Sequence, residues 1–570
     1  MRCDASSRRL VDAARGRSLI MKKPFLLLCA GMFGLANLTG LHAEVKLPAI
    51  FGDHMVLQQE AKLPVWGWAD PGEKVVVTFG AAKAEATAGA DGKWRINLPA
   101  VPAGIPPGVL VVAGKNVITI SDVLVGDVWL CTGQSNMEWQ LRSAHNAKEE
   151  IPKANDGQLR LFHVLTTLAI EPRADLIGSW EICSPKTVQN FTAIGYFFGK
   201  DLRAALNRPI GLIESSCGGT SVQAWTSLAA LEAVPSIRHH VEAFKQFAAN
   251  FPGGDAEFAA NQEAYRKWQR QVHDDPTYQA ALKDWTATST KAKAAGQPVP
   301  PQPVPSLPAP RKISFGGRCA TIWFNGTLAP VIPYAIKGAI WFQGEGNAGS
   351  AADSLEYRIL LPTLIADWRT RWGQGDFPFL IGQISNTGTL AKTADEAANW
   401  ALLRESQSKT LSVANTGMAV SVDLDPAGDV HFTDKVDVGS RLALAARHVA
   451  YGEKLVYSGP VYVSMKVEGG SVRVAFKEDS VGGGLIIGSS PWSDPKMPPF
   501  SKTELQGFAI AGGDKKWVWA EAKIDGNTIV VTNPTVTRPV AVRYAWADNP
   551  PCNLYNKEGL PASPFRTDQW

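Results

Sequence analysis

The sequence predicts an α/β protein: a parallel sheet with helices on both faces, flanked by β-sandwich-type regions and interrupted by an insertion. Three observations predict this. The 570 residues are too many for one compact core. Short apolar runs alternate with helical patterns through the middle of the chain, which is typical of a parallel sheet. At both ends, β-branched segments separated by turn residues favour antiparallel β structure instead.

Residues 1–43 have the pattern of a signal peptide, with translation starting at Met21. Two lysines follow Met21, then comes an apolar run over 25–35, and Ala43 is a plausible cleavage point. This run is shorter than the roughly 20 residues that cross a bilayer. We therefore expect an exported protein, periplasmic or secreted, with no stable membrane association once the leader is removed. A retained membrane anchor is the alternative.

The basic charge of the chain belongs to this leader. It holds seven of the 57 Lys and Arg residues and two of the 53 Asp and Glu residues, so the remainder has a formal net charge of −1. Such a balance gives no reason to expect nucleic acid as a partner.

Residues 44–122 are predicted to form an N-terminal β domain. The segments 74–79, 93–98 and 116–120 alternate or favour β-branched residues, and Pro71-Gly72 and Asp91-Gly92 are turn signals between them. A small β-sandwich is the simplest arrangement of such strands.

Residues 123–454 are predicted to form the α/β core. Buried strands are expected at 125–131, 211–215, 337–342, 378–384 and 418–422. Helices are expected at 193–206, 355–372 and 436–449. Pro362 should kink the second of these helices or delay its start, because proline cannot donate a helical hydrogen bond.

Two further regions complete the predicted organisation. An insertion at 228–310 contains a helical patch over 257–285 and ends in a Pro-rich run, 297–310, which has the composition of a spacer. Residues 455–570 form a C-terminal β region with strands at 471–476, 528–532 and 539–545.

The cysteines do not predict a metal site. Five remain after the leader, with no Cys-x-x-Cys pair, so a structural zinc site is not expected: Cys131, Cys183, Cys217, Cys319 and Cys552. An exported protein permits disulfides, but an odd number leaves at least one thiol unpaired. Nothing in the sequence predicts a cofactor.

The first candidate site residue is Ser135, in Gly133-Gln134-Ser135-Asn136-Met137 directly after the 125–131 strand. Ligands bind at the carboxyl ends of parallel strands. A serine on a strand-to-helix turn there presents its hydroxyl beside backbone N–H groups that can stabilise an oxyanion. An ordinary helix N-cap explains the same serine. Met137 shows that the Gly-x-Ser-x-Gly motif of α/β-hydrolases is absent.

Two more polar stretches follow predicted strands. Gly218 and Gly219 let a backbone N–H point into a cavity, although a plain loop is the alternative; Cys217 beside them is better explained as a buried or disulfide cysteine than as a nucleophile. Gln343, Glu345 and Asn347 cluster after the 337–342 strand. Gln343 or Asn347 is a candidate oxyanion donor. Glu345 is either a structural carboxylate or an acid of the site.

The fourth stretch holds the candidate base. His431 lies near Asp423, Asp425 and Asp429, just before the predicted 436–449 helix. A histidine near carboxylates suits a general base, because one ring nitrogen takes the serine proton while an acid orients the other. A lone surface histidine is the alternative.

The joint order of these blocks resembles the SGNH (GDSL-like) hydrolases, and within them the sialate O-acetylesterase-like group. The matching segments cover four blocks: Gly133 through Trp139; Gly218-Gly219-Thr220 with Ala224-Trp225; Trp341 through Glu345 with Asn347-Ala348; and Asp429-Val430-His431 with Lys435 and Gly439. The ending from Cys552 to Thr567 is also similar. The insertion resembles that of bacterial esterases acting on acetylated xyloglucan.

The resemblance implies a flavodoxin-like core and a metal-independent serine esterase. Ser135 would be the nucleophile, His431 the base and Asp429 the acid, with Asp423, Asp425 or Glu345 as alternative acids. Ser135 and Gly219 N–H groups with an Asn347 or Gln343 side chain would form the oxyanion hole. SGNH enzymes commonly place Asp three residues before the histidine, where this chain has Gly428.

The predicted function is hydrolysis of acetyl esters on sugars, with an acetylated hemicellulose (xyloglucan) oligosaccharide as substrate. The alternatives are a sialate O-acetylesterase and a non-catalytic carbohydrate-binding protein on an SGNH fold. The 19 Trp residues suit sugar binding as well as catalysis.

Overall fold

The computed structural model describes residues 44–308, 310, 319–396, 398–424, 428–489 and 501–570. The predicted leader, 1–43, and Asp425 lie outside these residues. Within the described ranges, no helix combines the length and the apolar character needed to span a membrane.

A seven-stranded path forms the centre of the molecule, in the order β13-β12-β11-β7-β10-β8-β9. Every neighbouring pair is parallel except β8 and β9. The strands are β7 (Val117–Gly133), β8 (Asp156–His163), β9 (Trp180–Cys183), β10 (Ile210–Ser216), β11 (Gly338–Phe342), β12 (Phe379–Gly382) and β13 (Thr416–Ala419). Runs of consecutive buried residues in β7, β10 and β11 indicate that both sheet faces are covered. This confirms the predicted α/β fold class.

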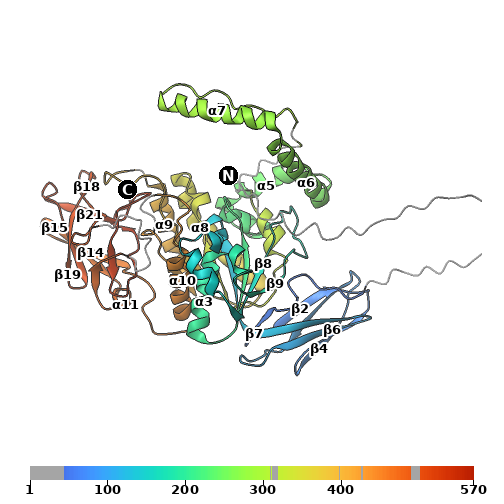
Figure 1. Ribbon diagram of the computed structural model, residues 1–570. Coiled ribbons are helices and arrows are strands. Elements are labelled where there is room, and N and C mark those ends of the chain that lie inside the picture. Colours follow the sequence, from blue (N-terminus) through green and yellow to red (C-terminus); the bar gives the residue numbers. More distant parts are fainter. Residues whose placement is uncertain (1–43, 309, 311–318, 397, 425–427, 490–500) are drawn as a thin grey trace, which may run out of the picture.

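Two helix pairs cover the sheet (Figure 1). They are α3 (Ala193–Leu206) with α10 (Lys435–Val449), and α8 (Ala351–Trp372) with α9 (Asn399–Lys409). Gly439 permits the close approach in the first pair, because a Cβ there would lie 2.5 Å from Phe197 Cβ. The expectation that Pro362 delays the start of this helix was wrong: α8 runs through Pro362 and begins four residues earlier than predicted, because tertiary packing outweighs the loss of one helical hydrogen bond.

The N-terminal β domain is joined to the core by one strand. The expected strands are present, with β5 alternating between exposed and buried side chains: β1 (Val56–Gln58), β2 (Leu63–Trp68), β3 (Lys74–Phe79), β4 (Ala82–Thr87), β5 (Lys93–Leu98) and β6 (Gly108–Ala113). β7 pairs with β6 through its first part and with β10 and β11 through its last. The predicted boundary at 122–123 therefore falls inside a continuous strand.

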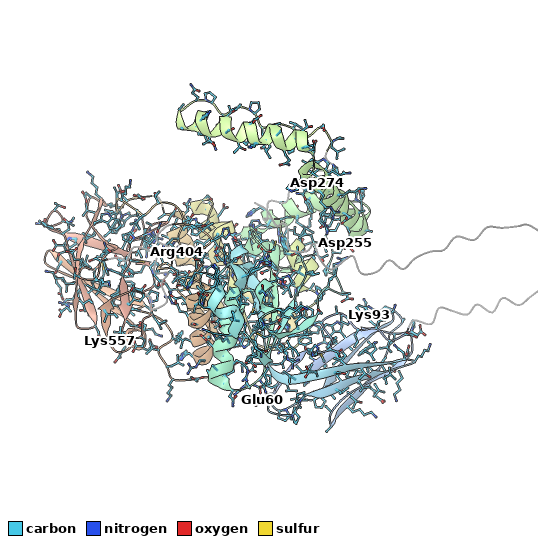
Figure 2. All side chains as sticks on the ribbon, viewed as in Figure 1. Glu60, Lys93, Asp255, Asp274, Arg404 and Lys557 are labelled. Atoms are coloured by element: carbon cyan, nitrogen blue, oxygen red, sulfur yellow. The ribbon has the colours of Figure 1, made fainter. Side chains whose placement is uncertain are left out.

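The insertion forms an arm that projects from the body (Figures 1 and 2). Its helices are α4 (Leu228–Glu232), α5 (His239–Ala248), α6 (Gly254–His273) and α7 (Pro276–Ala294). Asp255, labelled at the base of the arm, accepts a hydrogen bond from Ile170 N–H at 3.0 Å, and Asp274 marks the end of α6. Trp268 and Trp285 donate to the carbonyls of Leu307 and Pro300. The Pro-rich run therefore packs along the arm rather than serving as a free spacer.

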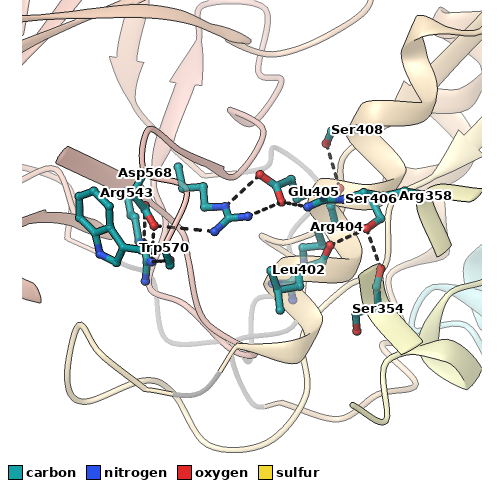
Figure 3. A network of polar contacts seen from close by, with 11 residues as sticks. Ser354, Arg358, Leu402, Arg404, Glu405, Ser406, Ser408, Arg543, Asp568 and Trp570 are labelled. Atoms are coloured by element: carbon teal, nitrogen blue, oxygen red, sulfur yellow. Dashed lines mark hydrogen bonds and ion pairs between the residues drawn. The ribbon is translucent and has the colours of Figure 1, made fainter. Parts of the chain in front are cut away.

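The C-terminal β region contacts α9 through an ion pair in a network that extends to α8 (Figure 3). Its strands are β14 (Tyr462–Glu468), β15 (Ser471–Phe476), β16 (Leu485–Ile487), β17 (Phe508–Gly512), β18 (Trp517–Trp519), β19 (Glu521–Asp525), β20 (Thr528–Thr532), β21 (Pro539–Tyr544), β22 (Leu554–Asn556) and β23 (Phe565–Arg566). Glu405 of α9 accepts two hydrogen bonds from Arg566, both at 3.1 Å, and also binds Arg358 of α8. Glu405 therefore bridges an arginine of the C-terminal region and an arginine of α8.

Candidate active site

Three strands end together at Gly133. Ser216 of β10 and Phe342 of β11 both pair with Gly133 of β7. β7 lies in the middle of the sheet, with β10, β8 and β9 on one side and β11, β12 and β13 on the other. In open α/β sheets, ligands bind at such a topological switch point. Gly133 has φ +139°, and a Cβ there would lie 2.1 Å from the Phe342 carbonyl oxygen. Only glycine fits this position, and the tight turn delivers Ser135 to the sheet edge.

Ser135 and His431 face each other at this edge. Ser135 is the first residue of the short helix α1 (Ser135–Glu138), and its Oγ lies 2.9 Å from Nε2 of His431. This distance is that of a hydrogen bond in which the hydroxyl donates to a neutral imidazole nitrogen. A hydroxyl with a base in this position can act as a nucleophile. The arrangement joins two residues 296 positions apart in the chain.

Asn136 holds the His431 segment against α1. Its Nδ2 donates to the Val430 carbonyl at 2.9 Å and to Glu345 Oε1 at 2.7 Å, while its Oδ1 accepts from Lys435 Nζ. Asn136 and Lys435 are fully buried. One amide therefore links three of the four sequence blocks.

Trp139 supports the imidazole from one side. Its ring stacks on that of His431, with centroids 5.6 Å apart and planes 19° apart. Lys435 Nζ lies 5.4 Å from the centroid of the same indole. The sequence assigned no role to Asn136, Trp139 or Lys435, although all three lie in the blocks that carry the resemblance.

The surroundings of His431 favour its neutral form. Burial lowers the pKa of the imidazole below its ordinary value, and the Lys435 ammonium lowers it further, whereas Asp429 raises it. The neutral imidazole, which is the form that accepts a proton, is therefore present at lower pH than for an ordinary histidine.

Replacing Lys435 tests this electrostatic effect. We expect Lys435→Gln to move the acid limb of the kcat/KM pH profile to higher pH, because the change removes a positive charge that lowers the pKa of His431. The glutamine amide keeps a donor for Asn136. Lys337→Gln is the matched control, since Lys337 lies over the ring of Tyr451 rather than at this site. An acid limb that stays in place or moves down would contradict the assignment.

The candidate acids are dispersed. Asp429 is exposed, and its Oδ1 accepts the His431 backbone N–H at 2.9 Å. Within the described part of the chain, no carboxylate oxygen lies within 4.0 Å of the His431 ring nitrogens. Asp423 instead accepts two hydrogen bonds from Arg441, both at 2.8 Å, and a third from Tyr555. The expectation that Asp423 could serve as the acid is therefore wrong, because a buried ion pair engages it.

Glu345 faces Asn136 rather than the histidine. Its Oε1 accepts the Asn136 amide, its Oε2 is buried without a partner among the described residues, and burial raises the pKa of this carboxyl. A structural carboxylate that positions Asn136 is the reading that fits these contacts.

Gly428 explains why this chain departs from the usual SGNH spacing. Its φ is +77°, and a Cβ there would lie 1.7 Å from the Gly388 carbonyl oxygen. Neither an aspartate nor any other side chain fits this position without moving the backbone.

The glycine pair lies beside the nucleophile. A Cβ on Gly218 would be 3.1 Å from Ser135 Cβ, and the Gly218 N–H donates to Glu138 Oε2 at 2.7 Å. Gly219 follows with φ +74° and is exposed, and its N–H has no acceptor among the described residues. The Gly219 N–H is thus the one of the pair that remains open to a ligand.

The two amide candidates differ in availability. The two protons of Gln343 Nε2 have three acceptors within 2.9–3.2 Å: Gln134 Oε1, the Thr220 carbonyl and Asn347 Oδ1. These bonds use the amide fully, so Gln343 holds the loops together and the prediction that it donates to an oxyanion was wrong. Asn347 Nδ2 donates to Gln223 Oε1 at 3.1 Å, which leaves its second amide proton unassigned.

The cysteines lie apart from this chemistry. None of the five described cysteines forms a disulfide; Cys319 is partly exposed and the other four are buried. Cys217 is buried beside Gly218 with its Sγ 3.8 Å from the Gly218 carbonyl oxygen. The reading of Cys217 as a buried residue rather than a nucleophile fits this placement.

Comparison with known proteins identifies the family. Residues 125–248 and 327–448 match the family described as "Carbohydrate esterase, sialic acid-specific acetylesterase". A sialate O-acetylesterase from Rattus norvegicus is 31% identical over 90% of this chain and 92% of its own, and the Homo sapiens enzyme is 27% identical over 91% and 92%. The crystal structure of a carbohydrate acetylesterase from Xanthomonas citri is 36% identical, covers 92% of this chain and all of its own, and superposes with a TM-score of 0.71.

The two matched family segments contain all four blocks and leave out α6 and α7. With relatives this similar along nearly the whole length, the chain belongs to the sialic acid-specific acetylesterase family of carbohydrate esterases and is a carboxylic-ester hydrolase.

Proposed function

We propose that the chain hydrolyses acetyl esters on sugars, with Ser135 as nucleophile and His431 as general base. The observation that supports this most directly is the 2.9 Å contact between Ser135 Oγ and His431 Nε2 at the carboxyl edge of the sheet. Ser135 Oγ attacks the acetyl carbonyl carbon while His431 accepts the hydroxyl proton. His431 then protonates the departing sugar oxygen, which leaves an acetyl-enzyme. Water, deprotonated by His431, hydrolyses that ester and regenerates Ser135.

The proposed oxyanion hole consists of the Ser135 and Gly219 N–H groups and the Asn347 amide. The Gly219 N–H is open, whereas the Gly218 N–H is bound to Glu138. Asn347 is held by Val222, Gln343 and Gln223, so its orientation is fixed before substrate binds. Fixed donors of this kind stabilise the charge that develops on the carbonyl oxygen.

We propose that Asp429 completes the site as the carboxylate that acts on His431. Its Oδ1 fixes the His431 backbone, and its charge raises the pKa of the imidazole, which stabilises the imidazolium formed during attack. Asp429 thus acts on His431 through its negative charge and through its hydrogen bond to the His431 backbone N–H.

Asp429→Asn separates charge from geometry, since the asparagine oxygen still accepts the His431 N–H. We expect kcat to fall roughly 10- to 100-fold, less than the loss of about 10⁴ for a carboxylate bonded directly to the imidazole. The acid limb should move to lower pH, because a charge that raises the His431 pKa is removed. Asp376→Asn, at an exposed aspartate four residues after the end of α8, is a matched control. If kcat and the pH profile of the variant were unchanged, Asp429 would have no role in catalysis.

For the substrate we propose an acetylated hemicellulose (xyloglucan) oligosaccharide. The chain is more similar to the bacterial carbohydrate acetylesterase, at 36% identity, than to the mammalian sialate O-acetylesterases, at 27–31%. The leader predicted for 1–43 agrees with an enzyme exported to the periplasm or beyond, where such polymers are met.

A substrate panel tests this assignment. Acetate release is compared for acetylated xyloglucan oligosaccharides, acetylated xylan and an O-acetylated sialoside, with Ser135→Ala as the blank. We expect the highest kcat/KM on xyloglucan. A higher value on the sialoside would replace the proposed substrate, and release from none of the three would favour a non-catalytic binding protein.

A further inference from the structure

Two histidines of the insertion converge on one glutamate of the core. His239 and His240 are the first two residues of α5, and Glu356 lies in the second turn of α8. His240 Nε2 is 2.9 Å from Glu356 Oε2, and His239 Nε2 is 3.4 Å from Glu356 Oε1. The two imidazole centroids are only 4.0 Å apart. The cluster shares no residue with the serine–histidine site.

Helix geometry alone does not produce this convergence. Successive side chains on an α-helix project about 100° apart and do not face each other. Here both rings nevertheless turn to the same carboxylate.

The ligand atoms of the cluster are of the kind that divalent transition metals accept. Imidazole nitrogens suit zinc and related ions, and a carboxylate oxygen often completes such a set. Asp353, one turn before Glu356 on α8, adds negative charge near the cluster.

We propose that His239, His240 and Glu356 bind a zinc ion that joins the insertion to the core. The ligand atoms of all three lie within 4.8 Å of one another. Around a tetrahedral zinc with bonds of about 2.0–2.2 Å, ligand atoms are roughly 3.4 Å apart. The 3.4 Å between His239 Nε2 and Glu356 Oε1 matches this value, whereas His240 Nε2 lies 2.9 Å from the other oxygen, Oε2, so the carboxylate or one ring must turn slightly for both imidazoles to share an ion with it.

This set leaves one coordination position for water. The His239 side chain is 61% exposed, whereas those of His240 and Glu356 are 15% and 21% exposed. Two imidazoles and a carboxylate are the nitrogen and oxygen ligands that zinc accepts. The ion would fix α5 at the root of the arm to α8, which begins four residues after Asn347.

Zinc titration of the tag-free, chelator-treated protein tests the proposal. By calorimetry we expect one zinc per chain, with a Kd in the micromolar range or tighter. Glu356→Gln and His240→Ala should each weaken binding at least roughly 10-fold, by analogy with the loss caused by altering groups around a metal site. Cobalt(II) bound in place of zinc should give the visible absorption of a tetrahedral site, and this should be lost in both variants.

The controls separate metal binding from folding and from the proposed function. His273→Ala removes an exposed histidine at the end of α6 and should bind zinc like the wild type. Circular dichroism and p-nitrophenyl acetate hydrolysis by metal-free Glu356→Gln should match the metal-free wild type. Binding weaker than millimolar, or binding that survives both substitutions, would overturn the proposal whether or not the esterase assignment holds.

Discussion

Ser135→Ala is expected to reduce kcat on p-nitrophenyl acetate by on the order of 10⁴–10⁶, the range in which loss of a nucleophile removes covalent catalysis. KM should change little, because the substitution removes one oxygen and keeps the Cβ beside Gly218. The residual rate above that in water then reports the oxyanion donors and substrate binding alone.

The loss must come from the hydroxyl and not from disturbed folding. Ser143→Ala, at an exposed serine in the segment after α1, is the matched control and should retain the wild-type rate. Unfolding curves of both variants should overlay that of the wild type. If Ser135→Ala kept most of the wild-type rate, another residue would be the nucleophile, and Ser135 would be only a helix-start serine.

His431→Ala is expected to cause a loss close to that of Ser135→Ala, because the serine hydroxyl is a poor nucleophile without a base 2.9 Å away. Since the two residues act as one unit, the Ser135→Ala/His431→Ala double variant should be no slower than the more damaging single variant. This lack of additivity is measured as a double-mutant cycle on kcat/KM.

His273→Ala serves as the control for histidine removal, since His273 is exposed on the arm. Losses that multiply in the double variant would mean that Ser135 and His431 contribute through separate steps, contrary to the proposed relay.

The order of the four blocks could be read from the sequence, because each block follows a predicted strand or precedes a predicted helix. Parallel strands end at one edge, so Ser135, Gly219 and Asn347 were expected together. The structure places them there through the register of Ser216 and Phe342 with Gly133. His431 is brought in by residues 428–434, directly before α10, and not by the end of a strand.

Side-chain networks could not be predicted in this way. The amide protons of Gln343 all have acceptors, whereas Asn347 keeps one amide proton without an acceptor among the described residues. This difference depends on which amides meet across β7, β10 and β11. Likewise, Asp423 and Asp429 are equivalent in sequence as carboxylates near a histidine. The structure distinguishes them, because Arg441 and Tyr555 bind Asp423, whereas Asp429 accepts the backbone N–H of His431.

Backbone details were also beyond the sequence patterns. Proline is unfavourable inside a helix, yet Pro362 lies within α8 between buried Leu361 and Leu364, and the packing of that face compensates. The glycine requirement at Gly428 comes from Gly388, which is 40 residues away along the chain.

Covalent labelling tests the central claim most directly. A fluorophosphonate reacts only with an activated serine, and mass spectrometry of the digested protein locates the adduct. We predict one phosphonyl group per chain, on the peptide containing Ser135, with labelling abolished in Ser135→Ala and greatly slowed in His431→Ala. An adduct on a different serine such as Ser216, or an active esterase that is never labelled, would contradict the account.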